Sequence, residues 1–267
     1  MLVYSLEMLV QSNIQEVFVF CNQNQNEIQN VIKEFKQQTS RKDMAIHLFV
    51  REEYNHLGPS IRELDSKGLI KNDFVLIYGD CVGNLKLKEL MEVHKENVRK
   101  NPGCVMTNIY RRTHPNHRVR HNNQETILLL DPESKIIFYD NSDSNLIEVP
   151  KDLLEENDCS LHYDLLDTFV SICSNKVPPD FSDNFDYESR DDFLHGLLAS
   201  VDLLQHFVYA HILEDGYAAR VLNISTYDSV SRDLIQRFAY PIAPDTVADY
   251  TYRWSNIFLH NKINFVE

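Results

Sequence analysis

The chain has 267 residues, of which 43% are hydrophobic, and a formal net charge of −14. The length and apolar content suit a folded protein with one large α/β domain or two small ones. The negative charge argues against a surface built mainly to hold nucleic acid, because phosphate contacts need lysine and arginine.

Through residue 110, apolar residues alternate between helical spacing and short continuous runs. Helical spacing predicts helices near residues 2–10, 28–35, 61–64 and 87–98. Continuous apolar runs predict strands at residues 17–20, 46–50, 74–78 and 105–110. Strands that alternate with helices in this way indicate βαβ units and a mostly parallel sheet.

After residue 110 the pattern changes. Two hairpins are predicted, from residues 126–130 with 136–139 and from residues 207–213 with 218–224. A strand at 168–173 and helices at about 190–205 and 227–238 complete the predicted elements. Residues 141–160 are interpreted as an acidic loop, and the tail after Pro244 as a linker.

The run from Phe74 to Tyr78 is apolar at every position and is followed by Gly79 and Asp80. It predicts a strand buried on both faces of a parallel sheet. Asp80 would then stand at the carboxyl end of the strand, where it could hold Mg²⁺ against a phosphate. Alternatively, Asp80 caps the following segment. No glycine-rich phosphate loop occurs among the seven glycines, so only half of a nucleotide site is present.

Other candidate sites give weaker signals. The basic stretch Arg111–His121 is interpreted as a solvated loop, with an RNA contact or a zinc site from His114, His117 and His121 as alternatives. The cysteines lack CxxC spacing, which favours reduced thiols in a cytosolic protein. We expect neither a membrane span nor a signal peptide, because long apolar runs and a basic amino-terminal region are lacking.

The stretch 183–193 combines carboxylates with aromatic residues. Its carboxylates suggest general acid–base catalysis, but a solvated loop followed by the helix-capping residues Asp191 and Asp192 is the commoner explanation. Phe185 and Tyr187 alternate with polar residues in a predicted loop. They are equally consistent with a protein interface and with packing back onto the core.

Longer motifs carry a family resemblance. Leu57-Gly58 and the segment Asp73–Asp80 resemble the nucleotide-sugar pyrophosphorylase superfamily. Later segments closely resemble the epsilon-subunit family of eukaryotic translation initiation factor 2B: His162–Ser174, Asp183–Leu198, Tyr217–Ile224 and Tyr240–Pro244. The resemblance covers nearly the whole chain.

The resemblance implies an α/β fold of the nucleotide-diphospho-sugar transferase type, Rossmann-like, with a mostly parallel mixed sheet flanked by helices and added hairpins. Residues 1–244 would form this domain without its first strand and glycine loop. Residues 245–267 would be a linker leading towards a left-handed β-helix that lies outside the chain, as would the exchange-catalysing domain.

The implied function is that of a non-catalytic scaffold in the guanine nucleotide exchange factor for the initiation factor 2 GTPase. Its partners would be the gamma subunit, the other subunits and the GTPase, in the cytosol. No cofactor, metal, membrane or direct nucleic-acid contact is expected. The alternative is an active sugar-phosphate nucleotidyltransferase that uses Mg²⁺ and a nucleoside triphosphate.

The resemblance also assigns residues. Asn184 and Phe185 match an Asn-Phe pair associated with exchange, and with Tyr187 and Arg190 they form the expected partner-binding set; Arg190 could also hold the loop by pairing with a carboxylate. Gly79 and Asp80 become a vestigial nucleotide and metal site. Where the enzymes place Glu-Lys-Pro, this chain has Tyr-Asp-Asn at 139–141, which removes the lysine expected to contact a sugar phosphate.

Overall fold

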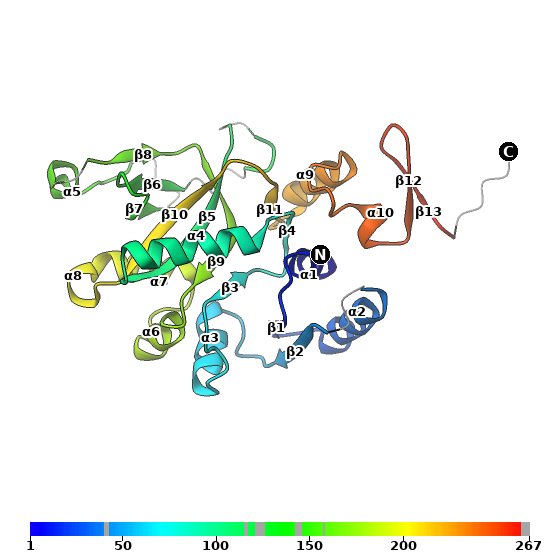
Figure 1. Ribbon diagram of the computed structural model, residues 1–267, viewed down its shortest axis with the longest axis horizontal. Helices are drawn as coiled ribbons and strands as arrows, with labels where there is room; N and C mark the ends of the chain where they lie inside the picture. The colour runs from blue at the N-terminus through cyan, green and yellow to red at the C-terminus, as the bar shows by residue number, and fades with distance from the viewer. Residues whose placement is uncertain (40–42, 115–116, 121–125, 142–145, 157, 263–267) are drawn as a thin grey trace.

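A mixed four-stranded sheet lies at the centre of the molecule. The structure, a computed structural model, describes residues 1–39, 43–114, 117–120, 126–141, 146–156 and 158–262 (Figure 1). The strand order is β10 (Phe207–Leu213), β5 (Cys104–Arg112), β9 (Leu165–Cys173) and β3 (Phe74–Ile77). β10 runs parallel to β5, while β9 is antiparallel to both β5 and β3. Three strands therefore share one direction and β9 is reversed.

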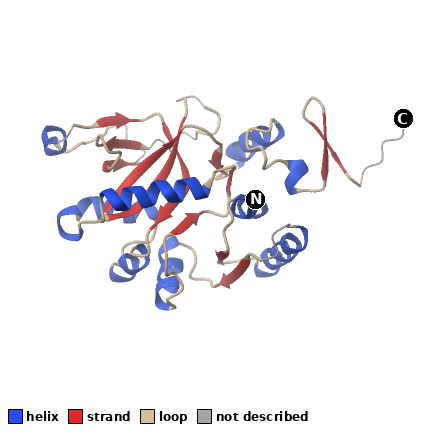
Figure 2. Ribbon diagram, in the orientation of Figure 1, coloured by secondary structure: helices blue, strands red, loops and turns tan. Residues whose placement is uncertain are grey.

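Helices cover both faces of this sheet, and each face has its own core (Figure 2). On one face, α4 (Leu87–Lys100) packs the apolar stripe that contains Leu87 and Leu90 in the same cluster as Ile109 of β5. The other face is covered by α3 (Leu57–Ser66), α6 (Val177–Asp183) and α7 (Arg190–Ala199), followed by the short α8 (Val201–Leu204). Tyr110, the neighbour of Ile109, belongs to this second core. Successive strand residues thus face opposite layers.

A second, smaller sheet lies beside the first. β1 (Glu16–Cys21) pairs in parallel with β2 (Ala45–Val50), and the two are joined by α2 (Gln25–Gln38). The chain enters this unit through α1 (Leu2–Gln11), which contacts α2 and β4 (Cys81–Gly83).

The remaining elements are hairpins and short helices around these sheets. β6 (Ile127–Leu130) pairs with β7 (Ile136–Asp140) and β8 (Ser160–His162), and α5 (Lys151–Glu156) lies between β7 and β8 in sequence. β11 (Ala218–Arg220) pairs with β4. α9 (Ile224–Ile235) is followed by α10 (Pro244–Val247) and by the hairpin of β12 (Tyr250–Arg253) and β13 (Ile257–His260).

The structure confirms the predicted α/β class with a mixed sheet and flanking helices, and it corrects several elements. The predicted hairpin of residues 207–213 and 218–224 is wrong, since β10 pairs with β5 and β11 pairs with β4. Residues 141–160 contain α5 and the start of β8, and the aperiodic tail contains α10 and a hairpin. None of the helices in the described part of the chain has both the length and the apolar character needed to cross a lipid bilayer.

The Phe74–Tyr78 prediction is also corrected in part. A strand forms, but it runs antiparallel to its partner β9, and all four of its side chains are only half-buried. The reason is that β3 has a neighbour on one side alone in the described part of the sheet. β3 is nevertheless apolar on both faces, as strands from the middle of a sheet are.

Candidate functional site

Asp80 lies in the turn between β3 and β4, at the end of the central sheet. β4 pairs with β11 so that Cys81 is opposite Arg220. This register brings the Arg220 side chain to Asp80, and Arg220 Nε donates a hydrogen bond of 2.8 Å to Asp80 Oδ1. The guanidinium also lies over two aromatic rings, 4.0 Å from the centroid of Tyr78 and 4.7 Å from that of Phe169. Asp80 is therefore tied to Arg220 and caps no helix.

In this arrangement the carboxylate considered as a magnesium ligand from the sequence is bound by Arg220. A magnesium ion binds carboxylate oxygens, and a guanidinium beside the same carboxylate repels the ion. Within the described residues, moreover, no group of three or more potential metal-ligating side chains is found. Asp80 stands at the predicted place, but Arg220 already neutralises its charge.

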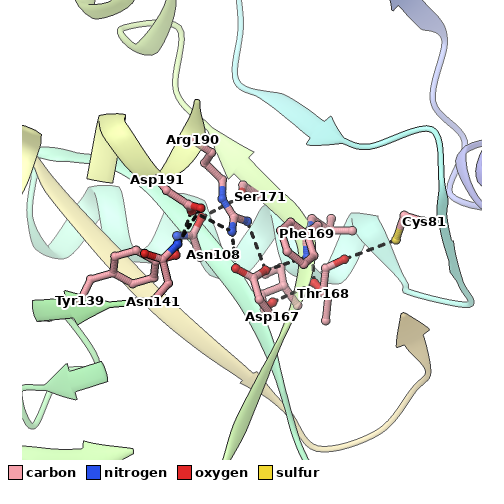
Figure 3. A network of polar contacts seen from close by, with 12 residues as sticks. Cys81, Asn108, Tyr139, Asn141, Asp167, Thr168, Phe169, Ser171, Arg190 and Asp191 are labelled. Carbon is pink, nitrogen blue, oxygen red and sulfur yellow. Dashed lines mark hydrogen bonds and ion pairs between the residues drawn. The ribbon is translucent and has the colours of Figure 1, made fainter. Parts of the chain in front are cut away.

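A buried ion pair lies near Phe169 (Figure 3). Arg190, at the first turn of α7, donates from one guanidinium nitrogen to Asp167 Oδ1 at 3.1 Å and from the other to Asp167 Oδ2. Arg190 and Asp167 are 2% and 6% exposed. Burial acts to lower the pKa of the arginine, but the Asp167 carboxylate outweighs it and raises that pKa well above the ordinary value. Arg190 is therefore a permanent buried cation that is bound by a carboxylate.

Asp167 also fixes the backbone of the strand. Phe169 N donates a 2.7 Å hydrogen bond to Asp167 Oδ1, and Phe169 has a φ of +56°. A residue other than glycine in this region is strained by about 1 kcal/mol or more. The Phe169 ring centroid lies 5.0 Å from the Arg190 guanidinium and 4.7 Å from that of Arg220, so the ring contacts both arginines.

The exit of the β6–β7 hairpin reaches the same network (Figure 3). Tyr139 Oη and Asn141 Nδ2 each donate a 2.8 Å hydrogen bond to the carboxylate of Asp191. Burial, followed by the Asp191 charge, raises the pKa of Tyr139. The residues at 139 and 141 thus hold the first turn of α7 in place. Asp192 forms a capping box with Ser189, as the helix-capping interpretation predicted.

The loop between α6 and α7 presents one aromatic side chain to solvent. Phe185 is 72% exposed, and the Arg62 guanidinium lies 5.0 Å above its ring. Arg62 is held by the backbone carbonyls of Phe181 and Tyr187, to which it donates hydrogen bonds of 3.3 and 3.2 Å. Asn184 Oδ1 accepts a 3.0 Å hydrogen bond from Asp186 N, which shapes the turn below Phe185. A solvent-facing ring thus stands on an ordered base.

Tyr187 and Arg190 do not contribute to this surface. Tyr187 is 6% exposed and packs edge-on against Phe181 and Phe193. Arg190 is 2% exposed, so in this structure neither residue of the predicted partner-binding set presents its side chain at the surface. They instead support the loop from below, and Arg190 pairs with Asp167 as the carboxylate hypothesis anticipated.

Arginines of the basic stretch form ion pairs and ring contacts with other parts of the chain. Arg118 forms an ion pair with the buried Asp233, and Arg112 donates to Asp164 at 2.7 Å. The Arg111 guanidinium lies 5.0 Å from the Tyr217 ring centroid. The side chains of Arg112 and Arg118 remain 61% and 40% exposed in these pairs and are therefore solvated, although Arg111 and Arg112 lie in β5 and not in a loop. His121 lies outside the described residues, so the three-histidine zinc hypothesis is not tested.

The buried thiols are unreactive. All five cysteines are free, and Cys81, Cys104 and Cys173 are buried. Burial raises the pKa of Cys81 to about 12 and that of Cys104 to about 11. Since the thiolate is the nucleophile, these thiols are inert at neutral pH.

Sequence reasoning missed three residues that organise the site, namely Arg62, Asp167 and Arg220. Each acts through a partner far away in sequence, and Arg220 lies 140 positions from Asp80. Only Arg220 carried a local signal, because it is a charge within the apolar run that begins at Ala218.

Comparisons with known proteins give both sequence relatives and fold relatives. The curated "Translation initiation factor eIF2B subunit epsilon" of Schizosaccharomyces pombe is 34% identical over 248 residues, which is 91% of this chain and 36% of that protein. The protein of the same name in Dictyostelium discoideum is 32% identical over 270 residues, 98% of this chain and 38% of its own length. The chain thus spans little more than a third of these relatives. No known family profile matches it.

Solved structures resemble the fold at low sequence identity. HddC from Yersinia pseudotuberculosis aligns with a TM-score of 0.53 and 14% identity, over 86% of this chain and 84% of its own. The inositol-1-phosphate CTP transferase from T. maritima aligns with a TM-score of 0.54 and 12% identity, over 86% and 82%. These likenesses confirm the predicted nucleotidyltransferase-like fold.

Proposed function

Because the chain is related to the epsilon subunit of translation initiation factor eIF2B over nearly its whole length, we propose that it is the nucleotidyltransferase-like part of such a subunit. In this role it is a scaffold and interaction module of the guanine nucleotide exchange factor that acts on the initiation factor 2 GTPase. Its partners are the gamma and other subunits and the GTPase, in the cytosol. The observation that carries the proposal is the ion pair of Asp80 with Arg220 in place of a free metal-binding carboxylate.

The surroundings of Asp80 support a non-catalytic role. A phosphoryl-transfer site needs a cation and backbone N–H groups to neutralise the phosphates. Here the carboxylate at the sheet end is paired with an arginine, and the side chains of Tyr139 and Asn141 are bound to Asp191. The residues that stand where the enzymes contact a sugar phosphate are thus engaged in contacts within the chain.

The loop carrying Asn184 and Phe185 supports a docking role. Exposed aromatic residues that stand on a fixed base lose little entropy on binding, which is why they often act as interface anchors. Arg62 adds a guanidinium beside the ring, and arginine is also enriched at interfaces. We therefore assign Asn184 and Phe185 to contact with the GTPase or a sister subunit.

The test is the double substitution Asn184→Ala with Phe185→Ala in the full-length subunit, assembled into its complex. Loss of an anchor above about 1 kcal/mol corresponds to a fall of about fivefold or more in affinity. We expect such a fall in GTPase binding or in the rate of GDP release, with an unchanged melting temperature. Phe238→Ala is the control, because Phe238 is a similarly exposed ring at 59% on another surface. Unchanged binding and exchange would reject the assignment.

The enzyme alternative rests on the fold likeness to the inositol-1-phosphate CTP transferase. It is tested by incubating the protein with a nucleoside triphosphate, Mg²⁺ and a sugar phosphate, with pyrophosphate release as the readout. We expect no turnover above the level of a protein-free control. Sustained turnover that is lost in Asp80→Asn would refute the scaffold proposal.

A further inference from the structure

The loop between α6 and α7 presents a single large apolar side chain to solvent. Residues 164–202 are all described by the structure, and among them Phe185 is the only large apolar residue that is exposed, at 72%. The guanidinium of Arg62 lies 5.0 Å from the centroid of this ring and covers one face of it. The rest of the ring stays open to solvent. A protein that binds here therefore meets one aromatic anchor and not a broad apolar surface.

Acidic side chains flank this ring within the loop. Asp183, Asp186 and Glu188 are all exposed and lie within three positions of Phe185. Neither Asp183 nor Asp186 forms an ion pair with any described residue. Glu188 Oε2 lies 3.8 Å from His56 Nε2, and both side chains are more than half exposed. A pair so open to water offsets little of the charge on Glu188.

The positive groups next to the loop do not cancel this charge. Arg62 donates from Nη1 to two backbone carbonyls of the loop and of α6, and not to a carboxylate. Arg190, at the start of α7, is buried and bound by Asp167. With His56 neutral, three exposed carboxylates against the one guanidinium of Arg62 leave two negative charges around the ring. The chain itself leaves that charge uncompensated.

We propose that the ring of Phe185 enters an apolar pocket whose rim carries lysine and arginine, and that this pocket lies on the GTPase. The inference rests on the proposed function and specifies the partner of the same surface. Exposed charges around an anchor act mainly at a distance, where they attract a surface of opposite sign and raise the association rate. A partner with a negative rim would be repelled by Asp183 and Asp186.

The composition of the surface decides between the GTPase and a sister subunit. Permanent interfaces between subunits are broad and apolar, and their buried centres contain few charged residues. Here one exposed ring stands among carboxylates, which is the pattern of a contact that forms and dissolves. A GTPase that is acted on by an exchange factor binds and leaves in every cycle, whereas a sister subunit stays. The loop of Phe185 therefore suits the GTPase.

The test follows association and dissociation of the GTPase with the complex that contains the full-length subunit. Biolayer interferometry is run at about 50, 150 and 400 mM salt, which covers weak to strong screening. Asp183→Asn with Asp186→Asn removes both unpaired charges and keeps the side-chain shapes. The matched control is Glu214→Gln with Asp215→Asn, two exposed acids between β10 and β11.

We expect the loop variant to lower the association rate about threefold or more at the lowest salt, with a dissociation rate within about twofold of the original. Its association rate should also depend less on salt, while the control follows the original chain. Phe185→Ala should instead raise the dissociation rate, because an anchor acts once the complex has formed.

The failures of this inference and of the proposed function are distinguishable. An unchanged or higher association rate in the loop variant would overturn the basic rim, and so would an equal fall in the control. A loss of assembly with the sister subunits in place of GTPase association would overturn the choice of partner. In each of these cases a weaker binding of Asn184→Ala with Phe185→Ala leaves the proposed function standing. If neither pair of substitutions changes GTPase binding, both are wrong.

Discussion

Replacing Arg190 by methionine gives the sharpest test of how the site is built. Arg190 is 2% exposed and its two terminal nitrogens bind the carboxylate of Asp167. Arg190→Met keeps an unbranched apolar side chain but removes the guanidinium, which leaves Asp167 buried with only the hydrogen bond from Phe169 N still in place. Removal of one partner of a buried pair costs about 3–5 kcal/mol. That is a large share of the roughly 5–15 kcal/mol by which folded domains are stable.

The assay is urea unfolding followed by far-UV circular dichroism. Fluorescence is a poor probe, because the single tryptophan, Trp254, is 82% exposed. Arg112→Met is the matched control, since Arg112 also binds a carboxylate, that of Asp164, at 2.7 Å. Those two side chains are 61% and 34% exposed. A pair in contact with water contributes about 1 kcal/mol or less, so the control is expected to unfold nearly as the original chain does.

The double variant Arg190→Met with Asp167→Asn completes the cycle. The asparagine keeps an oxygen for Phe169 N and removes the uncompensated charge. We expect the double variant to lose about 1–3 kcal/mol less than the sum of the single losses. The reasoning fails if Arg190→Met costs no more than Arg112→Met, or if the two single losses simply add.

Two further changes test the packing and the pH response. Burial lowers the pKa of His94 below its ordinary value of 6.5, so the unfolded chain takes up the proton more readily than the folded one. The stability contributed by neutral His94 is therefore complete above pH 6.5 and falls as the pH decreases below that value. His94→Gln keeps a hydrogen-bonding side chain beside Thr107 but does not titrate, so it should flatten the acidic part of a plot of melting temperature against pH. Gly196→Ala would place its β-carbon 2.2 Å from Tyr187 Cε1 and should cost about 1–3 kcal/mol in urea unfolding, whereas Gly79→Ala, with its nearest atom at 3.8 Å, should be tolerated.

Local patterns were sufficient where one element decides its own structure. The stripes in α2 and α4 predicted both helices, because the apolar spacing of a helix is written in its own residues. Gly68 has a φ of +58°, as expected of a glycine that ends a helix. The β6–β7 hairpin was predicted for the same reason, since a short turn leaves its strands little choice of partner.

Pairings over long distances in sequence were not accessible in this way. The chain does bend at Glu214 and Asp215, between the two strands of the predicted hairpin, and Gly216 has a φ of +109°. The strands on either side nevertheless do not pair with each other, because β10 pairs with β5 and β11 pairs with β4. The partner of a strand depends on the whole sheet, whereas turn chemistry acts over a few residues. For the same reason the ion pair of Arg220 with Asp80 could not be predicted, because it is made by the pairing of β11 with β4 and not by any local motif.

The two arginines around Phe169 show why the site is better suited to holding its own structure than to holding phosphate. Each guanidinium lies within 5.0 Å of the Phe169 ring, and each is bound to a carboxylate, Arg190 to Asp167 and Arg220 to Asp80. The two pairs cancel in charge, and Asp191, 3.7 Å from Arg190, adds a further carboxylate, so an incoming phosphate must displace a carboxylate to reach either arginine. At Arg190 this would leave Asp167 buried and unpaired, at a cost of several kcal/mol. Arg220 is the more accessible of the two, but its displacement would set the free Asp80 carboxylate beside the phosphate, and like charges at this distance repel.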